Sequence, residues 1–306
     1  MAYPVKEPSG NVLSRSVLYQ IEPRGLGTPD CESLVSYLGR LSEAHCLAVG
    51  HLLMYVIGPV LQQNQGLKPI LWLSRGASVN GMAPLARSCL DSLQILTGRP
   101  NLDCLTFLPW AGILTWPGLL RKIRAWCPRC LFAWHTQNSP LYEPLSWACS
   151  EVTMCADHQI ALTVRCPHPT CQNILPAYDS FYRPGFCSEC GGWLGLDSRT
   201  NVPPLSTRSV RYQMWVTSTV GQMIANANHL PETRDIVNGH LQRYLRRHTG
   251  KGNALFTVDA KTVKQWRGLS MPNLLHVCAA LRRTPFELVW ECVKDKRMAE
   301  EVPAGI

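Results

Sequence analysis

The chain has 306 residues, of which 46% are hydrophobic and 17% are charged. This balance is typical of folded domains that each bury a core, and it excludes extensive disorder. The formal net charge is +9, and 15 of the 30 Lys and Arg residues follow residue 204. A basic last third indicates a polyanionic partner such as nucleic acid, although a solvated positive face has the same composition.

The N-terminus lacks the basic stretch and apolar run of a secretory signal. The most apolar run, from Cys46 to Leu61, is too short to cross a membrane and is interrupted by Gly58-Pro59. We therefore expect a cytoplasmic protein with no membrane segment. Because cytosolic thiols stay reduced, the 14 cysteines are not expected to form a disulfide framework.

Three helices are predicted before residue 100. The first covers 28–45, where Thr28-Pro29-Asp30 provides start signals and apolar side chains follow at helical spacing. The second covers about 47–62, and the third covers 81–96 and ends at Gly98. Neither here nor elsewhere does the sequence contain a phosphate-binding glycine loop, a catalytic triad motif or paired carboxylates, so we expect no enzyme.

Eight cysteines fall between residues 127 and 190. Ligand pairs separated by two residues place two donors on one face of a Zn²⁺ ion, and two such pairs complete a tetrahedron. Four protein ligands leave no open position, which is typical of a structural ion and not of a catalytic one. The sequence therefore predicts two structural zinc ions. The predicted ligands are Cys127, Cys130, Cys155 and His158 for the first site, and Cys166, Cys171, Cys187 and Cys190 for the second.

Some ligand choices stay open. Cys149 is an alternative to Cys155, and His135 or His168 could compete for a ligand position. His168 lies inside the loop between two predicted ligands and is better interpreted as a bystander. Zinc would supply much of the folding free energy of residues 125–195, whose many Pro, Gly and Ser residues would otherwise fold poorly.

After Pro203-Pro204, residues 209–228 and 231–248 are predicted to be helical. The segment from Thr257 to Glu291 is similar to the later helices of a repressor-type helix-turn-helix module, in which 259–266 would be the recognition helix. Such modules also serve as protein-binding units, so base reading stays open. The candidate DNA contacts are Lys261, Thr262, Lys264 and Gln265 on this helix, and Arg246, Arg247, Lys251, Arg282 and Arg283 around it.

These elements predict a mainly α fold with two small zinc-ribbon-like modules. The expected organisation is an N-terminal helical region at 1–125, a tandem zinc-binding region at 126–200 and a helical, helix-turn-helix-like domain at 205–306.

Several motifs occur in an order that is typical of one family. Residues 32–40 read Glu-Ser-Leu-Val-Ser-Tyr-Leu-Gly-Arg, and residues 96–99 read Leu-Thr-Gly-Arg. Residues 126–130 read Trp-Cys-Pro-Arg-Cys, and residues 152–158 read Val-Thr-Met-Cys-Ala-Asp-His. With these motifs the chain resembles the TniQ family, which includes the TnsD target selectors of Tn7-like transposons. One departure is the four-residue gap between Cys166 and Cys171, where two residues are commoner.

The resemblance implies a non-catalytic, prokaryotic protein that selects the integration site in DNA transposition and recruits the AAA+ ATPase regulator TnsC. Some members read target DNA directly, whereas others bind a CRISPR effector complex of the Cascade or Cas12k type. With one helical module after the zinc region, this chain is closer to the shorter, CRISPR-associated type. A homodimer is an assembly that the analogy allows. The alternatives are a stand-alone, sequence-specific target selector of the TnsD type and a helix-turn-helix transcription regulator.

Overall fold

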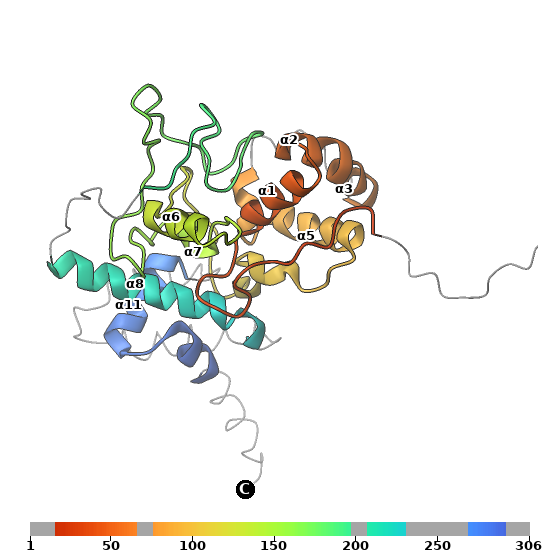
Figure 1. Ribbon diagram of the computed structural model, residues 1–306. Helices are drawn as coiled ribbons and strands as arrows, with labels where there is room; N and C mark the ends of the chain where they lie inside the picture. Colours follow the sequence, from red (N-terminus) through yellow and green to blue (C-terminus); the bar gives the residue numbers. More distant parts are fainter. Residues whose placement is uncertain (1–15, 66–75, 197–206, 231–268, 292–306) are drawn as a thin grey trace, which may run out of the picture.

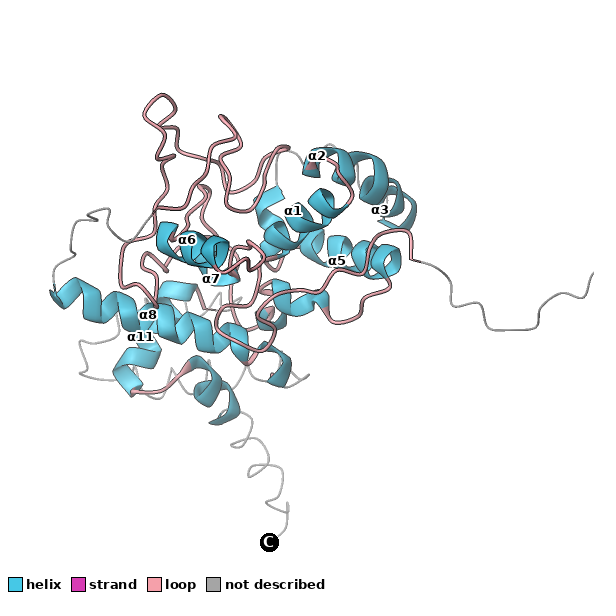
Figure 2. Ribbon diagram, viewed as in Figure 1, coloured by secondary structure: helices cyan, strands magenta, loops and turns pink. Residues whose placement is uncertain are grey.

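The computed structural model describes residues 16–65, 76–196, 207–230 and 269–291. Within these ranges the regular secondary structure is helical, and β-structure is limited to isolated bridges between single residues (Figure 2). The prediction of a mainly α fold is therefore confirmed. The predicted helices at 231–248 and 259–266 lie outside the described residues.

The first helix, α1, runs from Leu34 to Ala44 and is capped by Ser33, whose Oγ accepts a hydrogen bond from the Ser36 backbone N–H at 3.2 Å. The predicted start at Thr28-Pro29-Asp30 is wrong. The Thr28 hydroxyl instead donates to the Gly25 carbonyl and accepts from the Asp30 N–H, which closes a local turn. Short polar side chains that bond their own backbone in this way compete with helix formation.

Residues 49–65 form one continuous helical stretch made of α2 (Val49–His51), the π-helical turn η1 (Leu52–Ile57) and α3 (Gly58–Gln65). The predicted interruption at Gly58-Pro59 does not end the helix. The Gly58 N–H donates to the Leu53 carbonyl, five residues back, and this wider turn gives room to the following proline ring.

No single helix among the described residues is long and apolar enough to cross a membrane. Only α1 combined with Val49–Gln63 reaches the necessary length and hydropathy, and that pair is bent by 98°.

The predicted third helix is confirmed as α5, which spans Pro84–Thr97 and ends at Gly98 with a φ of 64°. Its buried face packs on α3 and on the short 3₁₀ turns η2 (Gly76–Asn80) and η3 (Leu102–Leu105). Gly98 suits this end because a left-handed residue terminates the helix without a Cβ clash. The helices up to α5 thus form one packed group, seen at the upper right of Figure 1.

The remaining helices cover the other side of the molecule (Figure 1). The short α7 (Leu145–Ala148), which follows α6 (Pro128–Thr136) in the chain, lies against α8 (Thr207–Ala225), and η5 (Ala227–His229) follows α8. Trp110, in η4 (Leu108–Trp110), donates its indole N–H to the Met223 carbonyl at 3.1 Å, which ties α8 to the N-terminal helices. The predicted helix at 209–228 is thus confirmed, and its buried face joins the same apolar core.

The predicted helix start at Ser270 is confirmed by α11, which spans Met271–Leu281 and is capped by the Ser270 hydroxyl. Residues 285–291 form a further helix. Thr284 and Glu287 exchange hydrogen bonds between side chain and backbone at its start, as in a capping box. These two helices are the described part of the predicted helix-turn-helix module, whose recognition helix lies outside the described residues.

Candidate metal centres

The first ligand pair stands at the start of α6. Cys127 is the residue before the helix and has an extended backbone, and Pro128 occupies the first helical position. Cys130 follows within the first turn, and the Leu131 N–H donates to the Cys127 carbonyl at 3.2 Å. A helix that begins directly after the first ligand therefore holds both thiol groups on the same side of the chain.

A tight hairpin at 153–162 presents the second pair. The Cys155 N–H donates to the Ile160 carbonyl at 2.9 Å, and the Gln159 N–H donates to the Cys155 carbonyl at 3.0 Å. The hairpin is joined to the residue before Cys127 by two backbone hydrogen bonds between Trp126 and Thr163, of 2.9 and 2.7 Å. This pairing brings ligands 25 residues apart in sequence into contact.

The four side chains of the first site meet at one point. The Nδ1 atom of His158 lies 3.6 Å from Cys127 Sγ, 3.3 Å from Cys130 Sγ and 3.7 Å from Cys155 Sγ. Cys130 Sγ and Cys155 Sγ are 3.5 Å apart. All three cysteines are buried and belong to the apolar core, whereas His158 is partly exposed.

The second site is built from loops. The Cys166 N–H donates to the Asn173 carbonyl at 2.9 Å, and the Cys171 N–H donates to the His168 carbonyl at 3.0 Å. On the facing loop, the Cys187 N–H donates to the Gly192 carbonyl at 2.8 Å. Gly191 makes this loop tight, because its φ of 72° is a left-handed conformation that residues with a Cβ rarely adopt.

The four thiols of the second site also gather, but they are less enclosed. Cys166 Sγ is 3.7 Å from Cys190 Sγ, and Cys171 Sγ is 3.9 Å from Cys187 Sγ. Cys166 and Cys187 are buried, Cys171 is half-buried and Cys190 is exposed. The structure thus brings together both predicted sets of four residues.

These separations fit four ligands around one tetrahedral ion. Zn–S bonds of about 2.3 Å and Zn–N bonds of about 2.0 Å place two sulfurs about 3.8 Å apart, and a sulfur and a nitrogen about 3.5 Å apart. The separations at both sites agree with these values to within a few tenths of an ångström. Thiolate and imidazole donors in a tetrahedral set are also the chemistry that zinc prefers.

The comparisons with known proteins agree with this arrangement. The TniQ family model matches residues 23–162, and a search of curated proteins finds no match. Residues 23–162 of this chain are thus similar to the TniQ domain. The domain includes α1, α5 and all four residues of the first site, and it ends four residues before the first cysteine of the second site. The resemblance to this family that the sequence predicted is therefore confirmed over residues 23–162.

The alternative ligands lie outside both sets. Cys149 is fully buried just after α7, where burial raises the pKa of its thiol to about 11. His168 Nε2 lies 3.2 Å from the Trp193 carbonyl oxygen, and the His135 ring packs against the Trp193 ring at 5.0 Å. The structure therefore favours Cys155 over Cys149 and agrees with a bystander role for His168.

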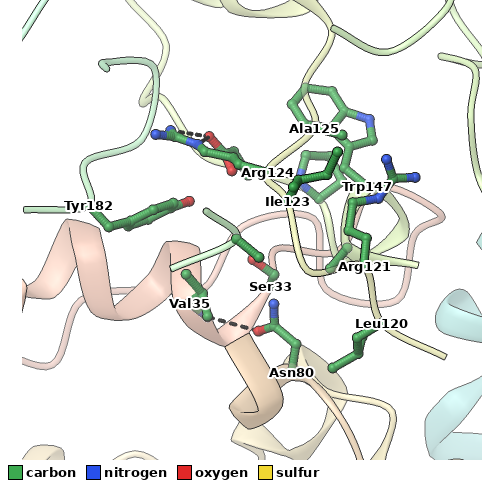
Figure 3. Close-up of a pocket in the computed structure, with 14 residues that line it drawn as sticks. Ser33, Val35, Asn80, Leu120, Arg121, Ile123, Arg124, Ala125, Trp147 and Tyr182 are labelled. Atoms are coloured by element: carbon green, nitrogen blue, oxygen red, sulfur yellow. Dashed lines mark hydrogen bonds and ion pairs between the residues drawn. The ribbon is translucent and has the colours of Figure 1, made fainter. Parts of the chain in front are cut away.

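A buried ion pair at residues 124 and 143 connects the two sites, and no sequence pattern predicted it. Arg124 forms an ion pair with Glu143, and both side chains are almost completely buried (Figure 3). The same guanidinium donates to the Phe186 and Arg183 carbonyls at 2.8 Å and lies over the Tyr182 ring. Burial lowers the pKa of Arg124, but Glu143, Tyr182 and Asp179 together raise it above its ordinary value, so the guanidinium stays charged.

The structure places only part of the predicted DNA-contact set. Arg282 and Arg283 are exposed at the end of α11, and Arg283 forms an ion pair with Glu291 at 2.9 Å. Arg282 ends the helix in a left-handed conformation with a φ of 53°. The other predicted contacts lie outside the described residues: Arg246, Arg247, Lys251, Lys261, Thr262, Lys264 and Gln265.

Proposed function

We propose that the chain is a target-selection adaptor of a Tn7-like transposition system of the CRISPR-associated type. In this role it links a target-bound complex, such as a Cascade or Cas12k effector, to the AAA+ regulator TnsC, and it acts in the cytoplasm of a prokaryote without catalysing a reaction. The observation that carries the proposal is the TniQ domain at 23–162, whose core encloses the first Cys/His set.

Both cysteine-rich sets are proposed to hold Zn²⁺. Cys127, Cys130, Cys155 and His158 would hold the first ion, and the second ion would take the four thiolates of the other set. A zinc ion bound at either site would cross-link segments that are distant in the sequence. All four donors at each site come from the chain, so the proposed ions have no position open to a substrate. Metal analysis of the purified protein by mass spectrometry should find two zinc ions per chain.

DNA contact is proposed to occur through phosphate groups. Arg282 and Arg283 are exposed at the end of α11, and the last third of the sequence carries 15 of the 30 Lys and Arg residues. Contacts to phosphate position a protein on the duplex but carry little sequence information. In the adaptor, sequence information would therefore come from a partner, and a homodimer would place two such surfaces on one target.

The deciding experiment is a binding selection of the zinc-loaded protein against a random duplex library at near-physiological salt. The adaptor proposal predicts salt-sensitive binding without an enriched motif, and equal weakening on all sequences when Arg282 and Arg283 are changed to Glu. An enriched motif that is lost on changing Lys261, Lys264 and Gln265 would instead identify a direct selector of the TnsD type.

A binding assay with purified TnsC from the same transposon tests the second half of the proposal. The zinc-loaded protein should bind TnsC, and the sequence of any DNA in the assay should not change that binding. Failure to bind TnsC, together with an enriched DNA motif, would favour a helix-turn-helix transcription regulator.

A further inference from the structure

An open groove of about 670 Å³ lies between the start of α5 and the segment that leads into the first metal site. One wall is formed by residues 78–85 and the other by residues 116–122. Neither wall contains a metal ligand, and the groove is separate from the exposed arginines of α11. Its volume is within the range of about 300–1000 Å³ that is usual for ligand clefts.

The second wall is held in place by the region between the metal ligands. The Ser150 N–H donates to the Leu119 carbonyl at 2.9 Å, and the Arg121 N–H donates to the Ala148 carbonyl at 3.0 Å. The two walls also meet closely, because a Cβ built on Gly81 would lie 3.1 Å from a Leu120 methyl carbon. The groove is therefore formed before anything binds, which limits the ordering cost of binding.

The groove is lined mainly by apolar groups, and the largest of them faces solvent. Trp116 has 66% of its surface exposed, and Pro84 beside it is exposed as well. Met82, Leu85 and Leu120 are only partly covered, with their inner sides packed on the core. Exposed apolar surface that is gathered in one concave place marks an interaction site, and tryptophan is a frequent anchor of such sites.

The charged side chains that line the groove are all positive. Arg121 and Lys122 are its charged lining residues, and no Asp or Glu lines it. Lys122 is exposed. Arg121 donates to the Cys149 carbonyl at 2.9 Å and to the Val152 carbonyl, but its buried Nε–H has no partner among the described residues.

Leu120 and Arg121, labelled in Figure 3, also line an internal cavity of about 30 Å³ beside the Arg124 ion pair. The α5 N-terminus adds partial positive charge, since the residue before it, Ala83, offers no capping side chain.

We propose that this groove, named the Trp116 groove, binds a short acidic peptide segment of a partner protein through apolar side chains packed on Trp116 and carboxylates facing Arg121 and Lys122. The combination of apolar lining groups with two cationic side chains and no acidic one matches a segment with apolar residues on one face and acidic residues on the other. The proposal goes beyond target selection and stands whether or not the chain reads DNA.

The test uses three fluorescein-labelled twelve-residue peptides and the zinc-loaded full chain. The first peptide carries Leu at positions i, i+3, i+4 and i+7 with Glu elsewhere, the second has Lys in place of Glu, and the third has Ala in place of Leu. Fluorescence anisotropy should show binding of the first peptide and at least about tenfold weaker binding of the other two. Trp116→Ala should weaken binding of the first peptide about tenfold, and Lys122→Glu should weaken it severalfold and most strongly at low salt.

The matched control is Tyr55→Ala, because Tyr55 is an equally exposed aromatic residue, at 71%, and lies outside the groove. This variant should bind the first peptide as the parent does. Thermal melting and zinc content should be the same for all variants, since Trp116 and Tyr55 are mostly solvent-exposed. Equal binding of the Glu and Lys peptides, an equal loss in Tyr55→Ala, or displacement of the Glu peptide by single-stranded DNA would overturn the proposal.

Discussion

The two metal sites share a ligand pattern but differ in how they are embedded. The first lies inside the TniQ domain, and its three cysteines are part of the apolar core. The second lies beyond residue 162, is built from loops, and leaves Cys190 exposed. Two ligand sets with similar spacing would therefore have different structural roles. With a metal bound, the first site would close the core of the domain, whereas the second, which adds Cys166 and Cys187 to that core, would stabilise a loop region attached to it.

The largest expected effect comes from breaking the first site. In Cys130→Ser, a poor zinc ligand replaces a buried thiolate, and a core segment loses its cross-link. Structural zinc sites contribute about 10–16 kcal/mol of apparent binding free energy in small domains, which is as large as the whole stability of a typical protein of about 5–15 kcal/mol. We expect the variant to lose its cooperative thermal unfolding transition in circular dichroism and to retain at most one zinc ion per chain.

Cys46→Ser is the control, because Cys46 is exposed and belongs to neither metal site. It should melt like the parent and keep two zinc ions. A folded Cys130→Ser protein with a parental melting temperature would show that the first site is not needed for the core.

The next effect concerns the connection between the two regions. Arg124 joins Glu143, which lies near α1, to the carbonyls of Arg183 and Phe186 on the loops of the second site. Arg124→Met leaves the Glu143 carboxylate buried without its partner, which typically costs about 3–5 kcal/mol. We expect a loss of that size in the free energy of unfolding measured with urea.

Arg87→Met is the comparison variant, because Arg87 forms an exposed ion pair with Asp103. Exposed pairs contribute about 0–1 kcal/mol, so this change should be nearly neutral. If Arg124→Met cost no more than Arg87→Met, the two regions would be held together by packing alone.

The metal ligands could be predicted from the sequence, whereas the Arg124 ion pair that connects the two regions could not. Cys127, Cys130 and their partners could be found because zinc requires soft donors at short spacing, and that requirement leaves a local pattern. Arg124 left no pattern, since its partners at 143, 183 and 186 are distant in sequence and two of them are backbone carbonyls. The start of α1 was missed for a similar reason, because Thr28 can either cap a helix or close a turn, and only the fold decides.

A smaller effect is expected from opening the second site. Cys190→Ser should remove one zinc ion per chain and leave the other in place. Amide hydrogen exchange should then rise in 166–193, because the Cys187 to Gly192 turn loses its metal, while exchange in α5 stays at the parental rate. A chelator should release this ion from the parent protein before the first one, since Cys190 is exposed. Faster exchange in α5 would contradict the division into a core site and an attached site.

The smallest effect is expected at His168, which lies inside the second site's first loop without being among the gathered ligands. Its Nε2 lies 3.2 Å from the Trp193 carbonyl oxygen, and its ring fills the space beside Gly192, where an added Cβ would lie 2.1 Å from Nε2. His168→Ala therefore loses about one hydrogen bond, worth about 1 kcal/mol, and should keep two zinc ions.

His158→Ala, by contrast, removes a ligand atom 3.3 Å from Cys130 Sγ and should keep one zinc ion. Zinc analysis of the two variants side by side separates a ligand from a neighbour, and loss of an ion in His168→Ala would make this histidine a ligand of the second site.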